Sequence, residues 1–184
     1  MIISDFQTQH CFIFRATHEH LKAVEAVFAD NVDLLRSTAC VKDAATLANE
    51  TVCSVVLPPG GEVANAFPLL IVSKNSDATI GVLEGYVGYP NASCLYIAQL
   101  YLSARFQRKG FGREVVSALL EQVVGRGIAE SRVSVNVPNW GALWFWARLG
   151  FTEVSGIHGA ARPGDGAVEL RRVLNERRGG ERVS

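Results

Sequence analysis

The clearest pattern in the chain is an apolar stripe between residues 112 and 124. Its members recur at helical spacing, whereas Glu121 and Gln122 lie off the stripe. Such a stripe predicts an amphipathic helix with one buried face. Gly125 and Gly127 follow at once and are suited to end that helix. The stripe consists of Val115, Val116, Leu119, Leu120, Val123 and Val124.

Weaker helical patterns occupy three other parts of the chain. We predict helices over residues 17–29, 43–52 and 139–149. Thr17 and Asp43 stand at the starts of the first two, where a side-chain oxygen can cap the exposed amides. The first of these segments carries an apolar stripe, and the second is rich in alanine, which favours a helix.

Several runs of β-branched, aromatic or alternating apolar residues predict strands. The residues 74–77 and 89–91 have the composition of turns, so the runs on either side of the first turn indicate a hairpin. Pro138 stops the pairing of the strand before it. The predicted strands are 11–15, 67–73, 79–89, 94–102, 132–137, 152–156 and 167–174.

These elements predict one α/β domain over residues 1–174. The chain has 184 residues, of which 48% are hydrophobic, so it can bury one sizeable core. The pattern contains no internal repeat and no second domain. Residues 175–184 are polar and rich in arginine and glycine, which predicts a frayed C-terminal tail.

Hydropathy and cysteine usage restrict the class of protein. No run approaches the ~20 apolar residues of a membrane span, and the N-terminus lacks the features of a signal peptide. We therefore expect a soluble, cytoplasmic protein with no membrane partner. Cys11, Cys40, Cys53 and Cys94 are scattered and show no metal-binding spacing, so we expect neither a disulfide nor a structural zinc.

Two histidines near the N-terminus give no metal site in our interpretation. His18 and His20 stand two positions apart, which places them on different faces of a helix. A metal ion would need a third ligand that the sequence does not supply. We expect no bound metal.

Positive charge is concentrated in one part of a chain whose formal net charge is zero. Residues 105–148 hold seven Lys and Arg against three Asp and Glu, while residues 1–104 hold five against ten. This local excess suits a small ligand with several phosphates. A nucleic-acid-binding module would show a broader basic face, so we expect no nucleic-acid partner.

A glycine loop joins the predicted strand at 94–102 to the helix at 112–124. The amides in the first turn of a helix have no acceptor within it, and the peptide dipoles leave partial positive charge there. Gly110 and Gly112 let a phosphate approach these amides closely because glycine has no Cβ. The loop therefore predicts a phosphate site. The basic residues around it are Arg108, Lys109 and Arg113.

Two motifs resemble those of the GNAT family of N-acetyltransferases, which move acyl groups from coenzyme A to amines. Gln107-Arg108-Lys109-Gly110-Phe111-Gly112 resembles its Q/R-x-x-G-x-G/A loop, and the segment from Asn139 to Phe151 resembles its N-x-x-A…G-F signature. Together they cover residues 95–151. The resemblance implies a mixed, mostly antiparallel sheet of about six to seven strands, flanked by about four helices and splayed between strands four and five.

By this resemblance, acetyl-CoA would lie in the splay between the strands at 94–102 and 132–137. One strand edge would pair with the pantetheine arm, and the glycine loop would hold the pyrophosphate. Asn139 would lie near the pantetheine or serve as a helix N-cap, and both roles can hold at once. The implied cofactor contacts are the main chain of Leu100, Tyr101 and Leu102, the loop residues Gln107, Arg108, Lys109, Gly110, Phe111, Gly112 and Arg113, and Asn139 and Trp146.

The implied reaction is direct attack of a neutral amine on the acetyl thioester, which requires a base for the amine. Glu84 is the only acidic residue in the predicted strands between 67 and 102. Burial would raise its pKa into the range of a base; the alternative is a Glu that faces solvent. Tyr86 and His158 are weaker candidates.

The sequence departs from the family at Trp146, where many members carry a tyrosine that protonates the leaving sulfur. An indole is not a useful acid. Either the thiolate leaves unaided or through water, or Tyr101 supplies the proton, or catalysis is poor. Trp146 then forms a wall beside the cofactor, and Trp140 and Trp144 belong to the core or to an interface.

The sequence thus favours an acetyl-CoA-dependent N-acetyltransferase that acts on a primary amine of a small molecule or peptide. The alternative is an acyl-CoA-binding sensor or scaffold without turnover, which Trp146 leaves open. A nucleic-acid-binding module that uses Arg105 and the arginines of the tail is least favoured. The sequence does not specify the acceptor or the range of acyl groups, and a homodimer stays open because family members often pair through sheet edges.

Overall fold

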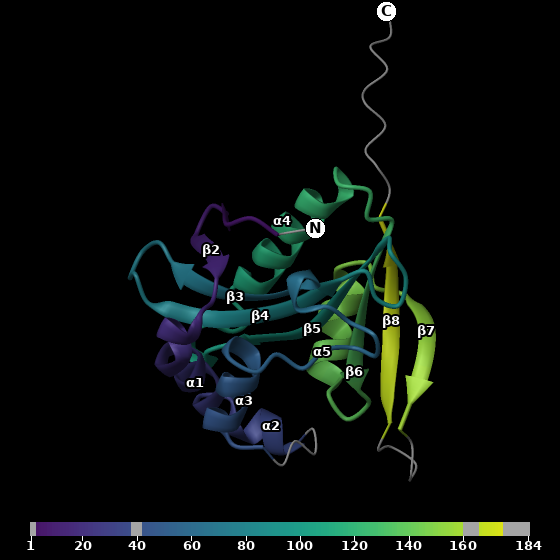
Figure 1. Ribbon diagram of the computed structural model, residues 1–184. Coiled ribbons are helices and arrows are strands. Elements are labelled where there is room, and N and C mark those ends of the chain that lie inside the picture. The colour runs from purple at the N-terminus through teal and green to yellow at the C-terminus, as the bar shows by residue number, and fades with distance from the viewer. Residues whose placement is uncertain (1–2, 38–41, 160–165, 175–184) are drawn as a thin grey trace, which may run out of the picture.

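The computed structural model describes residues 3–37, 42–159 and 166–174, and these ranges contain one sheet of eight strands (Figure 1). The strands lie in the order β1-β2-β3-β4-β5-β6-β8-β7. Every neighbouring pair is antiparallel except β5 and β6, which are parallel. The strands are β1 (Phe6–Gln7), β2 (Cys11–Arg15), β3 (Ala66–Ser73), β4 (Thr79–Val87), β5 (Cys94–Leu102), β6 (Glu130–Asn136), β7 (Glu153–His158) and β8 (Ala167–Val173).

Two of the helices begin at a residue whose side chain accepts a hydrogen bond from an amide of the first turn. Asp43 accepts a hydrogen bond from the Thr46 amide at 2.7 Å, and Asn139 accepts one from the Ala142 amide at 3.0 Å. Both are N-caps. The helices are α1 (Leu21–Ala29), α2 (Val32–Ser37), α3 (Ala44–Val52), α4 (Phe111–Val124) and α5 (Trp140–Arg148), with 3₁₀ turns η1 (His18–His20), η2 (Val63–Asn65) and η3 (Ala104–Phe106).

Two apolar clusters fill the opposite faces of the sheet. Successive side chains of a strand point to opposite faces, and in β3 Leu69 and Ile71 join one cluster while Leu70 joins the other. The larger cluster includes the buried stripe of α4 and the end of α5. The smaller cluster holds residues of α1 and α3. The two helix pairs therefore cover different sides of the sheet (Figure 1).

The sheet splits between its two parallel strands. β5 pairs with β6 only along residues 94–97 and 130–133. Beyond that point β5 stays paired with β4 alone, and β6 continues with β8. A parallel pair requires a crossover connection, and α4 provides it, so the loop before α4 lies at the end of β5.

The expected fold class is confirmed, including the mixed sheet and the splay between the strands at 94–102 and 132–137. The strand count is eight, above the expected range, because the two-residue β1 is too short to leave a period in the sequence. The six-residue helix α2 was also not anticipated. The predicted tail at 175–184 and the loop residues Arg162 and Asp165 lie outside the described residues. In the described parts of the chain, no helix has the length and apolarity that a bilayer crossing needs.

Candidate functional site

β5 presents an open main-chain edge in the split. The Ser103 amide donates to the Ile80 carbonyl at 2.9 Å, which fixes the alternation of the antiparallel β4–β5 ladder. The peptide groups of Tyr101 therefore point to β4, whereas those of Leu100 and Leu102 point away from it. Peptide groups at a strand edge can pair with an extended amide-bearing ligand.

The glycine loop has the backbone conformation of an anion site. Arg108 has φ +58° and Gly110, the residue before α4, has φ +94°. The first helical hydrogen bond runs from the Glu114 amide to the Gly110 carbonyl at 3.0 Å. The amides of residues 111–113 precede it, so they have no acceptor within the helix and are available to an anion.

Gly112 allows the two helices beside the split to approach each other. A Cβ at this position would lie 3.3 Å from the Phe145 ring of α5. Three exposed cations belong to the same loop and the first turn of α4, and within the described ranges no carboxylate forms a salt bridge with them. They remain free to pair with phosphate oxygens. These cations are Arg108, Lys109 and Arg113.

Gln107 holds the loop against the end of β5. Its side-chain amide donates to the Leu102 carbonyl at 2.8 Å and to Asn31 Oδ1 at 2.9 Å. The buried Asn31 also donates to the Leu102 and Val27 carbonyls, at 3.1 and 2.8 Å. Gln107 therefore acts through the shape of the loop, and Asn31 links α1 to it. No sequence pattern pointed to Asn31, because a polar residue after a helix is ordinary.

We expect Asn31→Ala to lower the free energy of unfolding by about 1–3 kcal/mol, since it removes a buried donor and leaves partners unsatisfied. Urea denaturation followed by circular dichroism measures the change. Asn75→Ala, at an exposed position in the β3–β4 turn, is the control and should change stability little. Equal stability of the two variants would contradict this role of Asn31.

The residues of α5 divide into a cap, a core residue and an exposed pair. Asn139 is the N-cap, as one of its two anticipated roles required. Trp146 is 5% exposed and packs edge-on against Phe145 and Phe151, with ring centroids 4.9 and 5.1 Å apart. It forms part of the core beside the split. Trp140 and Trp144 are 66% and 65% exposed, so of their two anticipated places, core or interface, the core is wrong and an interface stays a prediction.

Glu84 lies on β4 in a buried setting, with 9% of its surface exposed. The Gln99 side-chain amide donates to its carboxylate and also to Thr51 Oγ1 at 3.0 Å. Burial raises the Glu84 pKa to about 7; the Gln99 hydrogen bond opposes this and the Glu50 carboxylate adds to it. Glu84 can therefore gain and lose a proton near neutral pH, which suits a general base.

This shifted pKa predicts a stability effect. Between pH 4.5, the ordinary pKa, and about 7, the folded state binds the Glu84 proton more tightly than the unfolded state does. Stability is therefore lost as the pH rises through this window. We expect Glu84→Gln to match the parent at pH 5 and to exceed its free energy of unfolding by about 3 kcal/mol at pH 8. Urea denaturation at both pH values tests this prediction. If the variant and the parent differ in free energy of unfolding by the same amount at both pH values, the prediction is contradicted.

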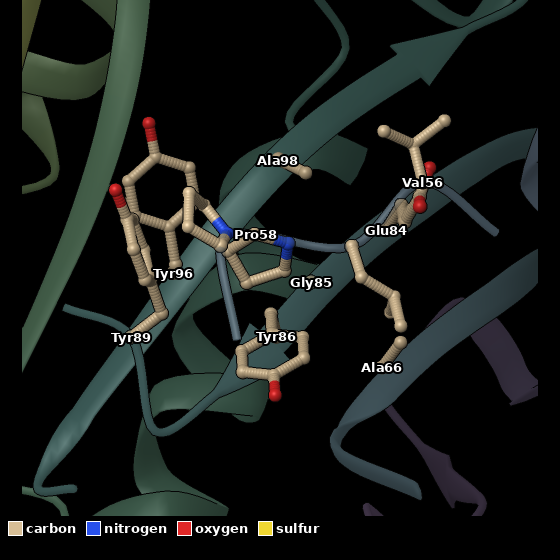
Figure 2. Close-up of a pocket in the computed structure, with 11 residues that line it drawn as sticks. Val56, Pro58, Ala66, Glu84, Gly85, Tyr86, Tyr89, Tyr96 and Ala98 are labelled. Carbon is tan, nitrogen blue, oxygen red and sulfur yellow. The ribbon is translucent and has the colours of Figure 1, made fainter. Parts of the chain in front are cut away.

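A cavity of about 290 Å³ lies beside Glu84 on the face that α3 covers (Figure 2). Its walls come from β3, β4 and β5, and the segment after α3 forms the cover. It adjoins the position where β5 leaves β6, so the cavity and the open strand edge are neighbours. The lining residues are Val56, Leu57, Pro58, Pro59, Ala66, Glu84, Gly85, Tyr86, Tyr89, Tyr96 and Ala98.

A β-bulge in β5 shapes this cavity. Gln99 pairs with Glu84 and Tyr96 pairs with Tyr86, so Ala98 is an extra residue in the ladder. Residues three apart on a regular strand point to opposite faces. The bulge places Gln99 and Tyr96 on the same face, where both reach the surroundings of Glu84.

The other three candidate catalytic residues lie in surroundings that differ from those of Glu84. They are Tyr101, Tyr86 and His158. The Tyr101 ring packs against Phe28 of α1 at 5.3 Å between centroids, on the side of α1 and α3. The Tyr86 hydroxyl accepts a hydrogen bond from the Glu62 amide at 2.8 Å. His158 lies at the end of β7, with its Nε2 3.8 Å from a Glu169 carboxylate oxygen, and does not line the cavity.

The described residues contain neither a candidate metal cluster nor a disulfide. No cluster of three or more His, Cys, Asp or Glu that could hold a metal occurs among them. His20 Nδ1 instead lies 3.0 Å from Thr17 Oγ1. Cys11, Cys53 and Cys94 are free thiols, while Cys40 lies outside the described ranges.

Sequence reasoning missed Tyr89, Tyr96 and the cover of the cavity. Residues 57–61 have the Pro and Gly content of a loop, which indicates no role in a site. Two aromatic residues around a turn could have suggested an aromatic wall, but their alignment with Glu84 depends on the strand register, which the sequence pattern did not supply.

A split sheet beside a glycine loop is the fold of solved acetyltransferases. An acetyltransferase from Thermus thermophilus superimposes with a TM-score of 0.70 at 15% identity, covering 92% of this chain and 100% of that one. An acetyl transferase from Salmonella typhimurium, which modifies the N-terminal serine of ribosomal protein L7/L12, gives 0.72 at 20% identity, with 91% and 97% covered. The PaiA N-acetyltransferase of Thermoplasma acidophilum in complex with coenzyme A gives 0.66 at 16% identity, with 89% and 98% covered.

The acetyltransferase (GNAT) family model matches residues 56–151, just over half of the sequence. This chain therefore belongs to the GNAT acetyltransferase family. No curated protein sequence matches it.

Proposed function

We propose that this protein transfers the acetyl group of acetyl-CoA to a primary amine by direct attack. The observation that carries the proposal is the position of Glu84, a buried carboxylate with a pKa of about 7 in a cavity beside the open edge of β5. An acceptor amine in the cavity and a thioester along the strand edge would meet there. Family membership supports the acyl-transfer class.

The residues around the split suit an acetyl-CoA co-substrate. The first-turn amides of α4, with Arg108, Lys109 and Arg113, would hold the pyrophosphate. The main-chain groups of Leu100 and the amide of Leu102 would pair with the pantetheine arm, because the Leu102 carbonyl already accepts from Gln107 and Asn31. Trp146 and Asn139 would border it from α5. The coenzyme A complex of the Thermoplasma relative supports this assignment.

Glu84 would accept the amine proton while the nitrogen forms its bond to the acetyl carbon and the carbon–sulfur bond breaks. Gln99 would keep the carboxylate oriented through its hydrogen bond. Trp146 cannot supply the proton that the leaving thiolate takes up, because its indole is a donor only and is not acidic. We propose that water supplies this proton.

Calorimetry with acetyl-CoA, followed by thiol-release assays with amino acids, polyamines, aminoglycosides, arylalkylamines and short peptides, tests the proposal. We expect donor binding and thiol release with at least one amine. Donor binding without release for any amine would favour the alternative, an acyl-CoA sensor or scaffold. An absence of donor binding would overturn both.

A further inference from the structure

The cavity beside Glu84 has an aromatic end and a carboxylate end. Tyr89 and Tyr96 lie together at one end, with ring centroids 5.5 Å apart in an edge-on arrangement. Glu84 and Val56 lie at the other end, with Pro58 between the two (Figure 2). An occupant would thus have its cationic group at one end and its carbon skeleton along the tyrosines and prolines.

The size of the cavity limits the occupant to a small molecule. A cavity of about 150 Å³ holds a benzene molecule, and this one measures about 290 Å³. The cavity is partly open to solvent, and the space within it suits one ring with a short side chain.

The charges of the cavity restrict the occupant further. Among the described residues that line it, Glu84 is the only one with a charged side chain, and none is Lys or Arg. Burial, and next the Glu169 carboxylate, raise the Tyr96 pKa, so this phenol stays neutral. A carboxylate on the ligand would find no cation and would face Glu84. A second ammonium group at the tyrosine end would find no carboxylate among the residues that line the cavity.

Two hydrogen bonds hold the C-terminal end of the segment that covers the cavity. The Gly61 amide donates to the Pro58 carbonyl at 2.8 Å, which closes a turn. The next residue, Glu62, donates its amide to the Tyr86 hydroxyl on β4 at 2.8 Å. The cover is therefore anchored to β4 at its C-terminal end.

We infer that the acceptor is a small primary amine on an aromatic or apolar skeleton that carries no acidic group and no second ammonium. This inference rests on the proposed function for its catalytic part, but the cavity's preference for the ligand can be measured without turnover. The ammonium group pairs with Glu84, and the ring packs against Tyr89 and Tyr96. The ammonium first loses one proton to solvent; the neutral nitrogen then attacks, and Glu84 accepts the second proton as the bond to the acetyl carbon forms.

The test uses pairs of amines that differ in one group. We compare 2-phenylethylamine with phenylalanine, which adds only a carboxylate, and hexylamine with 1,6-diaminohexane, which adds only an ammonium. Ligand-observed NMR with the full chain measures binding in the presence and absence of coenzyme A. We expect the first member of each pair to bind at least about tenfold more tightly.

Two substitutions locate the binding. Tyr96→Ala should weaken 2-phenylethylamine binding about tenfold through the loss of ring contact, while the Kd for acetyl-CoA stays unchanged. Val56 is 65% exposed, so Val56→Arg should fold, and its guanidinium beside Glu84 should shift the preference toward phenylalanine by about tenfold. Circular dichroism confirms that both variants are folded.

Three outcomes would overturn the inference: equal binding within either pair of amines, no binding of 2-phenylethylamine, or faster thiol release with a short peptide than with 2-phenylethylamine. If acetyl-CoA fails to bind while 2-phenylethylamine binds with the expected preference, the proposed function fails and the inferred ligand class stands. If acetyl-CoA binds and only phenylalanine or a polyamine is acetylated, the proposed function stands and the inferred ligand class fails.

Discussion

Glu84→Gln is expected to lower kcat/KM for the acceptor about 100- to 1,000-fold, with little change in the Kd for acetyl-CoA. The substitution keeps the side chain's size and a hydrogen-bond acceptor for Gln99, but it removes the proton acceptor. The expected loss matches the rate enhancement that a positioned general base typically contributes. Thiol-release kinetics and calorimetry on the same preparation separate the two quantities.

The pH profile distinguishes a base from a residue that only positions the amine. In the parent, Glu84 should add a limb of unit slope, up to its pKa of about 7, to the rise in log kcat/KM that the titration of the free amine gives. Glu84→Gln should lose this limb and keep only the titration of the free amine. Glu50→Gln is the matched control: burial is the main cause of the raised Glu84 pKa, and the Glu50 charge adds to it, so its removal should move the limb to lower pH. A limb near pH 7 that persists in Glu84→Gln would assign the base to another group.

Gly110→Val should raise the Kd for acetyl-CoA by about tenfold or more. Gly110 has φ +94°, where a β-branched residue costs about 1–2 kcal/mol, so the loop would rearrange. Isothermal titration calorimetry measures the affinity, and thermal denaturation shows whether the fold is retained.

Gly125→Ala is the matched control at the opposite end of the same helix. Gly125 has φ −69°, and nothing lies within 4 Å of a Cβ placed there. The control should keep the parent's affinity for acetyl-CoA. If both variants bind equally well, the diphosphate is not held by the start of α4, and the assignment of the donor site fails.

Local patterns were sufficient to predict the elements around the split. The strand at 94–102 and the caps Asp43 and Asn139 are confirmed, and the predicted helix at 112–124 agrees with α4 to within one residue. Each depends on interactions within a few residues of the chain, such as the apolar stripe of α4. The glycine loop was also recognisable because a single segment contains its amides and its cations.

The acceptor cavity could not be predicted because it depends on contacts between distant segments. A regular strand would place Tyr96 and Gln99 on opposite faces, and only the bulge at Ala98 brings them together. The cover at Val56–Pro59 comes from a segment that shows no period. The burial of Glu84 follows from this arrangement, so the sequence alone could not predict that its pKa is raised.

The parallel pairing of β5 and β6 has a consequence for how this enzyme could change its specificity. The residues proposed to hold the thioester lie in one uninterrupted stretch, from Leu100 to Trp146, because the crossover helix has to connect the two strands. The cover of the cavity comes from a separate stretch near Pro58. A graft of residues 54–62 from a relative would therefore change the cover of the proposed amine site and leave the proposed acyl-donor residues unaltered.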